Sequence, residues 1–309
     1  MNRPARSIEI FTMSALDLFV TAMGSFAILM MILFPYYMAD KKAAAKKSGK
    51  TAPSPVMEDV PIEGESVLFC IWPTRVQDYE QFVKETGYDG KDPNYTGASD
   101  LLPVETAWRD PGFEQGPDHP VVGVSWRDAR MFCQWLTKKE REAGRIRPED
   151  YYRLPTDAEW SAAVGPAKYP WGDQWPPPAD AGNLAGQELT LALGNTEANA
   201  PLGSFRDEYP FTSPVGSFAP NRFGLYDMAG NVFQIILDWY RNDMMSPELK
   251  KRVGLQDVPP RTRRFARGSS SQSTFEGKLL SESHDAFPPR SRWEDTGFRC
   301  VLVVRSDSK

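Results

Sequence analysis

The sequence predicts an irregular α+β domain tethered to a single N-terminal transmembrane helix. Three observations support this fold class: a long uncharged run near the N-terminus, a few short helical patterns, and long Trp-, Pro-, Gly- and Asn-rich stretches with short strands between them. The predicted parts are a cytoplasmic N-terminus (1–10), a transmembrane helix (11–39), a linker (40–65), a folded domain (66–305) and a tail (306–309).

The transmembrane prediction rests on the run from Leu18 to Ala39, which contains 22 consecutive uncharged residues. A helix of that length covers about 33 Å, enough to cross a hydrocarbon core of roughly 30 Å. The run is longer than the apolar part of a signal peptide, and no clean cleavage site follows it. A retained anchor is therefore favoured over a cleaved signal or a buried core helix.

The elements of the folded domain follow from local signals. Apolar residues recur at helical spacing in 76–89 and in 125–144, which predicts two amphipathic helices. Thr156 and Glu159 form a capping box that opens a third, shorter helix. The run FRCVLVV at 298–304 predicts a strand near the end of the domain.

Composition excludes several classes of protein. The net charge of −5 and the absence of a basic stripe argue against nucleic-acid binding. The only two histidines, His119 and His284, lie far apart in the sequence, which excludes zinc sites built on several His ligands. Three cysteines exclude a disulfide-dense scaffold but permit one bridge.

The folded domain resembles the formylglycine-generating-enzyme (sulfatase-modifying factor) family. The matching segments occur in family order and include HPVVGVSWRDARMFCQWL, YRLPTDAEWSAAV, YPWGD, PVGSFAPNRFGLYDMAGNVFQIILDWY, RFARGSSSQS and DTGFRCVLV. The resemblance covers about residues 66–305. It implies an irregular α+β fold, distantly like C-type lectins and often stabilised by calcium.

One departure from the family pattern decides the expected chemistry. The family's oxidases use a pair of copper-binding cysteines in the segment after the RGGS motif, and here that segment, 266–287, contains no cysteine. Serine cannot replace a thiolate as a copper(I) ligand at neutral pH. The resemblance therefore predicts that copper is not bound and that the chain is not an oxidase. A rearranged active site is a less favoured alternative.

The resemblance also implies a first calcium site in two loops. Its ligands would be the side chain of Asn183, the carbonyl of Leu184, the side chain of Asp207 and the carbonyl of Tyr209. Hard oxygen ligands of this kind suit Ca²⁺. The alternative is that Asn183 and Asp207 only satisfy the loop backbone.

A second family calcium site falls on the segment GNVFQI. Asn231 and Val232 match the family pattern, but Gln234 stands where the family has a glutamate. The lost negative charge is expected to weaken calcium binding there.

The resemblance implies a disulfide between Cys133 and Cys300, with Cys70 left free. Such a bridge would indicate an oxidising space outside the cytoplasmic membrane. The alternative is a pair of unpaired buried thiols.

The N-terminal helix resembles the membrane helix of the ExbD/TolR and MotB families, the B subunits of rotary stator complexes. It carries Asp17 near its beginning, with Ser14 and Thr21 at helical spacing from it. A carboxylate desolvated among helices has a raised pKa and can carry a proton. An interfacial Asp17 that caps the helix or reaches the headgroups is the alternative.

These resemblances lead to a first hypothesis for function: a B subunit of a proton-driven motor in the bacterial inner membrane. A dimer of this chain would stand within a ring of multi-span A subunits, and its periplasmic domain would bind an unknown target such as cell wall or glycan. The lysines of 41–50 contradict the required cytoplasmic N-terminus under the positive-inside rule. A membrane-anchored, lectin-like binding module, with Trp171 or Trp175 stacking on sugars, is the second hypothesis.

Overall fold

The computed structural model describes residues 57–60, 66–88, 90, 108–196, 201–243, 246–253, 259 and 261–305. All of them belong to the second of two compact units, which begins at Ser54. The transmembrane helix predicted at 11–39 lies outside the described residues. Within the described ranges, none of the helices combines the length and the apolar character needed to cross a bilayer.

The first of two sheets is entirely antiparallel. Its four strands lie in the order β1 (Met57–Val60), β2 (Ser66–Cys70), β8 (Val301–Val304) and β3 (Tyr151–Arg153). The register pairs Val67 with Val303 and Tyr152 with Leu302. The sheet therefore joins the beginning of the domain to its end.

The second sheet contains the segments that surround the family's redox position. Its order is β6 (His284–Phe287), β5 (Arg264–Arg267), β4 (Phe233–Trp239) and β7 (Thr296–Phe298). Strand β7 is parallel to β4, whereas the other pairs are antiparallel, and the β4–β5 register shifts between Ile235 and Trp239.

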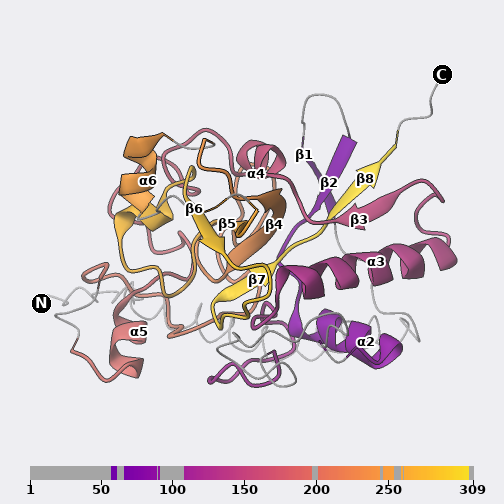
Figure 1. Ribbon diagram of the computed structural model, residues 1–309. Coiled ribbons are helices and arrows are strands. Elements are labelled where there is room, and N and C mark those ends of the chain that lie inside the picture. Colours follow the sequence, from indigo (N-terminus) through magenta and orange to yellow (C-terminus); the bar gives the residue numbers. More distant parts are fainter. Residues whose placement is uncertain are drawn as a thin grey trace, which may run out of the picture. The chain divides into compact units, whose positions relative to one another are not determined.

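Two longer helices cover the first sheet. Helix α3 (Trp126–Glu142) contacts β3, and α2 (Val76–Thr86) packs against α3 (Figure 1). Aromatic rings fill the space between them, with Tyr79, Phe82 and Phe132 all buried in one core cluster. Both helices confirm the sequence prediction, because periodic apolar faces and capping residues fix a helix locally.

The remaining helices are short. Helix α4 (Asp157–Val164) contacts β4 and β5 and begins at Thr156, whose side chain forms the predicted capping box with Glu159. The sequence prediction did not include the other three. They are α5 (Gln187–Ala192), α6 (Pro247–Val253) and the 3₁₀ helix η2 (Glu276–Leu279).

The chain passes from one sheet to the other within the run predicted as one strand. Residues 296–298 pair with β4, and residues 301–304 pair with β2 and β3. Between them the fully buried Arg299 donates to Gln234 Oε1 at 2.6 Å and to the carbonyl of Cys70 at 3.0 Å. The single-strand prediction is therefore wrong, because a buried guanidinium interrupts the ladder to bind acceptors from both sheets.

Candidate functional site

The segment after β5, residues 268–283, occupies the place where the family's oxidases carry cysteines. Serines fill it, and three of them hold the loop together. Ser269 Oγ accepts a hydrogen bond from Gly230 N at 2.8 Å, Ser270 Oγ donates to Asp295 Oδ2 at 2.9 Å, and Ser273 Oγ accepts from Ser270 N at 3.0 Å. These buried hydroxyls stabilise the loop backbone and supply no soft ligand for a metal.

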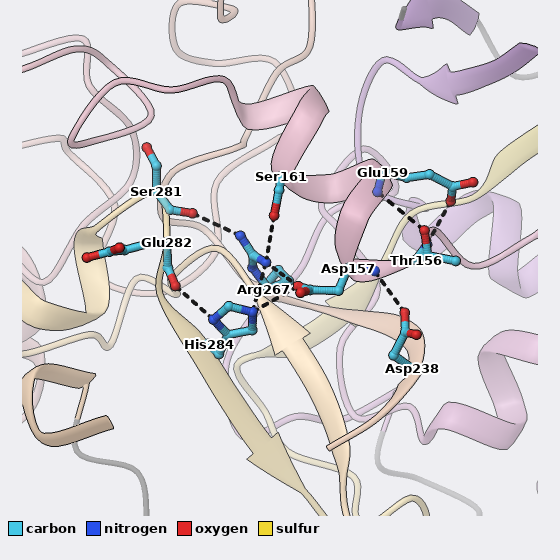
Figure 2. A network of polar contacts seen from close by, with 9 residues as sticks. All are labelled: Thr156, Asp157, Glu159, Ser161, Asp238, Arg267, Ser281, Glu282 and His284. Atoms are coloured by element: carbon cyan, nitrogen blue, oxygen red, sulfur yellow. Dashed lines mark hydrogen bonds and ion pairs between the residues drawn. The ribbon is translucent and has the colours of Figure 1, made fainter. Parts of the chain in front are cut away.

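A buried polar network lies beside this segment (Figure 2). Arg267 at its centre is 1% exposed and forms an ion pair with Asp157. It also donates to Ser161 Oγ at 3.2 Å and to the carbonyl of Ser281 at 3.0 Å. Burial raises the pKa of Asp157, but the contacts with His284 and Arg267 outweigh burial and bring that pKa to about 2. Asp157 is therefore a carboxylate at neutral pH.

His284 completes the network, and both of its ring nitrogens are engaged. Nδ1 lies 2.7 Å from the carbonyl of Glu282, and Nε2 lies 2.9 Å from Arg267 Nη1 and 2.8 Å from Asp157 Oδ1. Nδ1 faces a carbonyl oxygen, which can only accept, so Nδ1 carries a proton. Burial is the largest influence on His284 and lowers its pKa, while the contact with Asp157 opposes burial. The network therefore joins α4 to β5 and β6, and leaves no nitrogen to act as a general base.

Two adjoining clefts open beside the network and share the lining residues 164–167. One, of about 580 Å³, is lined in part by Arg267 and Ser281. Among the described residues, Arg267 Nε and Ser281 Oγ have no hydrogen-bond partner. The other cleft, of about 520 Å³, is lined in part by Trp171. Trp175 is not one of its lining residues and is 44% exposed.

The structure brings together the four residues predicted for the first calcium site. Asp207 Oδ2 accepts from Leu184 N at 2.7 Å, and Asp207 Oδ1 accepts from Tyr209 N at 2.9 Å. Asn183 donates through Nδ2 to the carbonyl of Phe211, while its buried Oδ1 has no partner within the described part of the chain. An orphaned amide oxygen beside a buried carboxylate fits a hard cation such as Ca²⁺.

Sequence reasoning missed a further acid near this site. Glu188 has a buried Oε2 without a partner among the described residues, and its charge contributes to the raised pKa of Asp207. Burial is the larger cause and raises that pKa to about 6. A glutamate five positions after Asn183 was the available signal, but α5, which carries it, was not predicted.

The residues of the second predicted calcium site are arranged differently. Asn231 Oδ1 accepts from Ser213 N at 3.1 Å, and Gln234 Oε1 accepts from Arg299 Nε at 2.6 Å. Both side-chain oxygens are thus engaged with protein donors, one of them the buried cation Arg299, while Val232 is fully buried. This donor set does not fit a calcium ion, because the guanidinium of Arg299 is bound to Gln234 Oε1 and its positive charge repels a cation.

The predicted cysteine pair is close in space. The sulfur atoms of Cys133 and Cys300 lie 3.3 Å apart, both thiols are reduced, and both are buried. A disulfide bond measures about 2.05 Å, so a small movement would close the bridge. Cys70 lies with its Sγ 3.4 Å from Met57 Sδ. Disulfide formation stays a prediction.

The domain has two sheets joined by a buried arginine, together with short helices and long loops. Serines fill the segment where the family's oxidases carry cysteines. These features define a formylglycine-generating-type domain. The family model of the sulfatase-modifying factor enzyme 1-like domain matches residues 68–304. The chain belongs to this family, which confirms the resemblance and the fold predicted for residues 66–305.

Curated relatives include active and inactive proteins. The chain is 32% identical over 198 residues to the formylglycine-generating enzyme of Thermomonospora curvata, with 60% of this chain and 56% of that protein covered. It is 33% identical over 219 residues to the inactive C-alpha-formylglycine-generating enzyme 2 of Bos taurus, with 65% and 58% covered. The match thus spans little more than half of each relative, and the family name alone does not decide whether this member is catalytic.

A solved structure supports the fold alone. The structure of PvdO from Pseudomonas aeruginosa superposes with a TM-score of 0.52 at 21% sequence identity, covering 81% of this chain and 91% of that one.

These findings correct the hypothesis drawn from the N-terminus. The family model and the relatives indicate a sulfatase-modifying-factor-type domain, so the description of the chain as a proton-driven motor subunit is wrong. They give no support to the stator resemblance or to ion transport. Asp17, Ser14 and Thr21 lie outside the described residues. The error came from giving a short motif, one carboxylate in an apolar run, more weight than a family pattern of some 240 residues.

Proposed function

We propose that this chain is a non-catalytic member of its family, whose domain binds another molecule without oxidising it. The observation that carries the proposal is the serine-filled segment 268–283, in which Ser273 accepts a hydrogen bond within the loop and Ser270 donates to Asp295. The only thiols of the chain, Cys70, Cys133 and Cys300, are buried elsewhere in the fold. A relative named as inactive supports the idea that the family fold is also used without catalysis.

The cleft of about 580 Å³ beside the network supports binding next to the lost redox position. Arg267 Nε and Ser281 Oγ, which lack partners among the described residues, belong to its lining residues. Buried polar groups without partners are costly, and a bound molecule with polar groups would satisfy them. The charges of the network itself are balanced by the ion pair of Arg267 with Asp157.

The full chain should neither bind copper(I) tightly nor convert a cysteine-containing peptide to formylglycine in the presence of copper and oxygen. Copper binding is measured by competition with a chromophoric chelator, and the peptide by mass spectrometry, with the Thermomonospora curvata relative as positive control. Formylglycine formation would overturn the proposal. Tight copper binding that survives in Cys133→Ser would overturn it too, since that variant breaks the buried thiol pair.

We further propose that Ca²⁺ stabilises the domain through Asn183, Leu184, Asp207 and Tyr209. The support is the buried Oδ1 of Asn183, which has no partner in the described part of the chain, next to the buried carboxyl group of Asp207. When bound, the ion would add its charge to the hydrogen bond from Leu184 N to Asp207 Oδ2, which already joins the two loops. Its role is structural, because it ties the loop at 183–184 to the loop at 207–209.

Calcium stabilisation is expected to grow as the pH rises through about 6. Burial raises the pKa of Asp207 from 3.8 to about 6, so without calcium this group contributes stability below pH 4 that is lost as the pH rises past 6. The rise of this pKa from 3.8 to about 6 corresponds to about 3 kcal/mol in the free energy of unfolding. Calcium prefers the carboxylate, so added calcium should raise Tm more at pH 7.5 than at pH 5.

The matched variant is Asp207→Asn, which keeps the shape of the side chain and removes its titration. It should lose most of the calcium-induced rise in Tm and its pH dependence, as measured by thermal unfolding in calcium and in chelator. Gln234→Ala serves as the comparison at the second position, where we expect no change in the response to calcium. A calcium response that is the same in Asp207→Asn as in the parent chain would contradict the assignment.

A further inference from the structure

A third hollow of about 350 Å³ lies apart from the two clefts described above and shares no lining residue with them. It forms where the start of α3, the end of β4 and the start of β5 meet. Arginines and tryptophans dominate the lining, which includes Trp126, Arg127, Arg130, Trp239, Arg264 and Arg290. None of the described residues that line the hollow is acidic.

Arg264 is held rigidly in this hollow. Its guanidinium carbon lies 3.6 Å from the ring centroid of Trp126 and 3.5 Å from that of Trp239, so the cation is stacked between two indoles. Nη1 donates to the carbonyl of Leu237. The residue is 7% exposed, and its buried Nε has no hydrogen-bond partner among the described residues. One donor of a rigid, buried cation therefore remains unsatisfied.

The charges around Arg264 are unbalanced. Arg130 lies over the Trp126 ring at 4.8 Å, and its positive charge acts on Arg264. Burial first, and then Arg130, lower the pKa of Arg264 to about 10. Asp238 opposes this effect, and its Oδ2 accepts a hydrogen bond at 2.8 Å from Asp157 N of helix α4. The positive charges of Arg130 and Arg264 repel each other, and a bound anion would relieve that repulsion.

We propose that this hollow binds the oxyanion of a small organic molecule, a carboxylate or a phosphate group, through Arg264 and Arg130. Guanidinium groups suit such anions, because their planar N–H donors match two oxygen atoms at once. The volume accommodates a small ligand, and the flanking indoles offer apolar surface to its body. This site does not depend on the redox segment, so the outcome of the copper experiment does not affect it.

Binding of probe anions to the full chain tests the site. Pyrophosphate represents the phosphate group and citrate the carboxylate group, each titrated by calorimetry against sodium chloride at matched ionic strength. We expect saturable binding of at least one probe, with affinity reduced at least about tenfold in Arg130→Gln, because a charge-assisted hydrogen bond contributes roughly 1.5–3 kcal/mol. Arg130 is exposed, so this variant should fold like the parent chain.

The matched control is Arg252→Gln, which removes an arginine of helix α6 that pairs with Glu282 at 2.8 Å and does not line the hollow. It should bind the probes like the parent chain. The probe that binds decides between phosphate and carboxylate. Absence of saturable binding by both probes, or equal affinity in Arg130→Gln and the parent chain, would overturn the proposal.

Discussion

Replacing Arg299 by leucine is expected to lower the free energy of unfolding by about 4 kcal/mol or more. The side chain is fully buried, and its guanidinium makes four hydrogen bonds of 3.3 Å or less, to Gln234 Oε1 and to the carbonyls of Cys70, Ile71 and Tyr226. Leucine supplies no donor, so several buried acceptors lose a partner, each at a cost of about 1–3 kcal/mol. Urea unfolding of the full chain, followed by circular dichroism, measures the loss.

The control for this substitution is Arg241→Leu. Arg241 is 66% exposed in its side chain and pairs at the surface with Asp243, so its loss should leave the free energy of unfolding nearly unchanged. Arg299 is the residue at which the chain changes sheets, between β7 and β8. Similar losses for the two variants would show that this buried network does not stabilise the junction.

Gly230→Ala should also destabilise the domain, by about 4 kcal/mol. Gly230 has φ +69°, and a β-carbon there would lie 2.0 Å from the carbonyl oxygen of Asn183. The backbone must shift, because the obstacle is itself backbone. An isolated β-bridge pairs Gly230 with Asn183, a proposed calcium ligand, so the variant should also weaken the calcium-induced rise in Tm.

Gly87→Ala separates the steric overlap of the added β-carbon from the conformational penalty of a non-glycine residue at positive φ. Gly87 has a similar φ of +66° at the end of α2, but nothing lies within 4 Å of its added β-carbon. Its substitution should cost only about 1 kcal/mol, the conformational penalty alone. If both glycine variants unfold at the same urea concentration, steric overlap at Gly230 is not the dominant effect.

Local chemistry explains which parts of the fold were predictable. Helices α2, α3 and α4 have apolar periodicity or capping boxes, and these signals lie within a few residues of each other. Strands β4, β5 and β6 were not predicted individually, because their burial depends on partners distant in the sequence. Arg264 and Arg267, both in β5, are charged residues that a strand pattern does not reveal as buried.

Some features of the candidate site were likewise visible in the sequence, and others were not. The absence of cysteine from 266–287 was visible in the sequence, and so were the four residues proposed for the first calcium site. The engagement of Gln234 by Arg299 was not visible, because 65 positions separate them. The motor hypothesis failed for a different reason, since one carboxylate in an apolar run is a weak motif whatever its position.

The sequence by itself determined the family, the three capped or periodic helices and the loss of the redox thiols, because each follows from residue identity over short distances. Only the tertiary structure decided which polar groups are paired and which are left without a partner. It closed the second calcium position with protein donors, and it left Asn183 Oδ1 and Arg264 Nε without partners among the described residues. The physical reason is that hydrogen-bond satisfaction and charge balance depend on which distant segments meet, and chain order does not specify this.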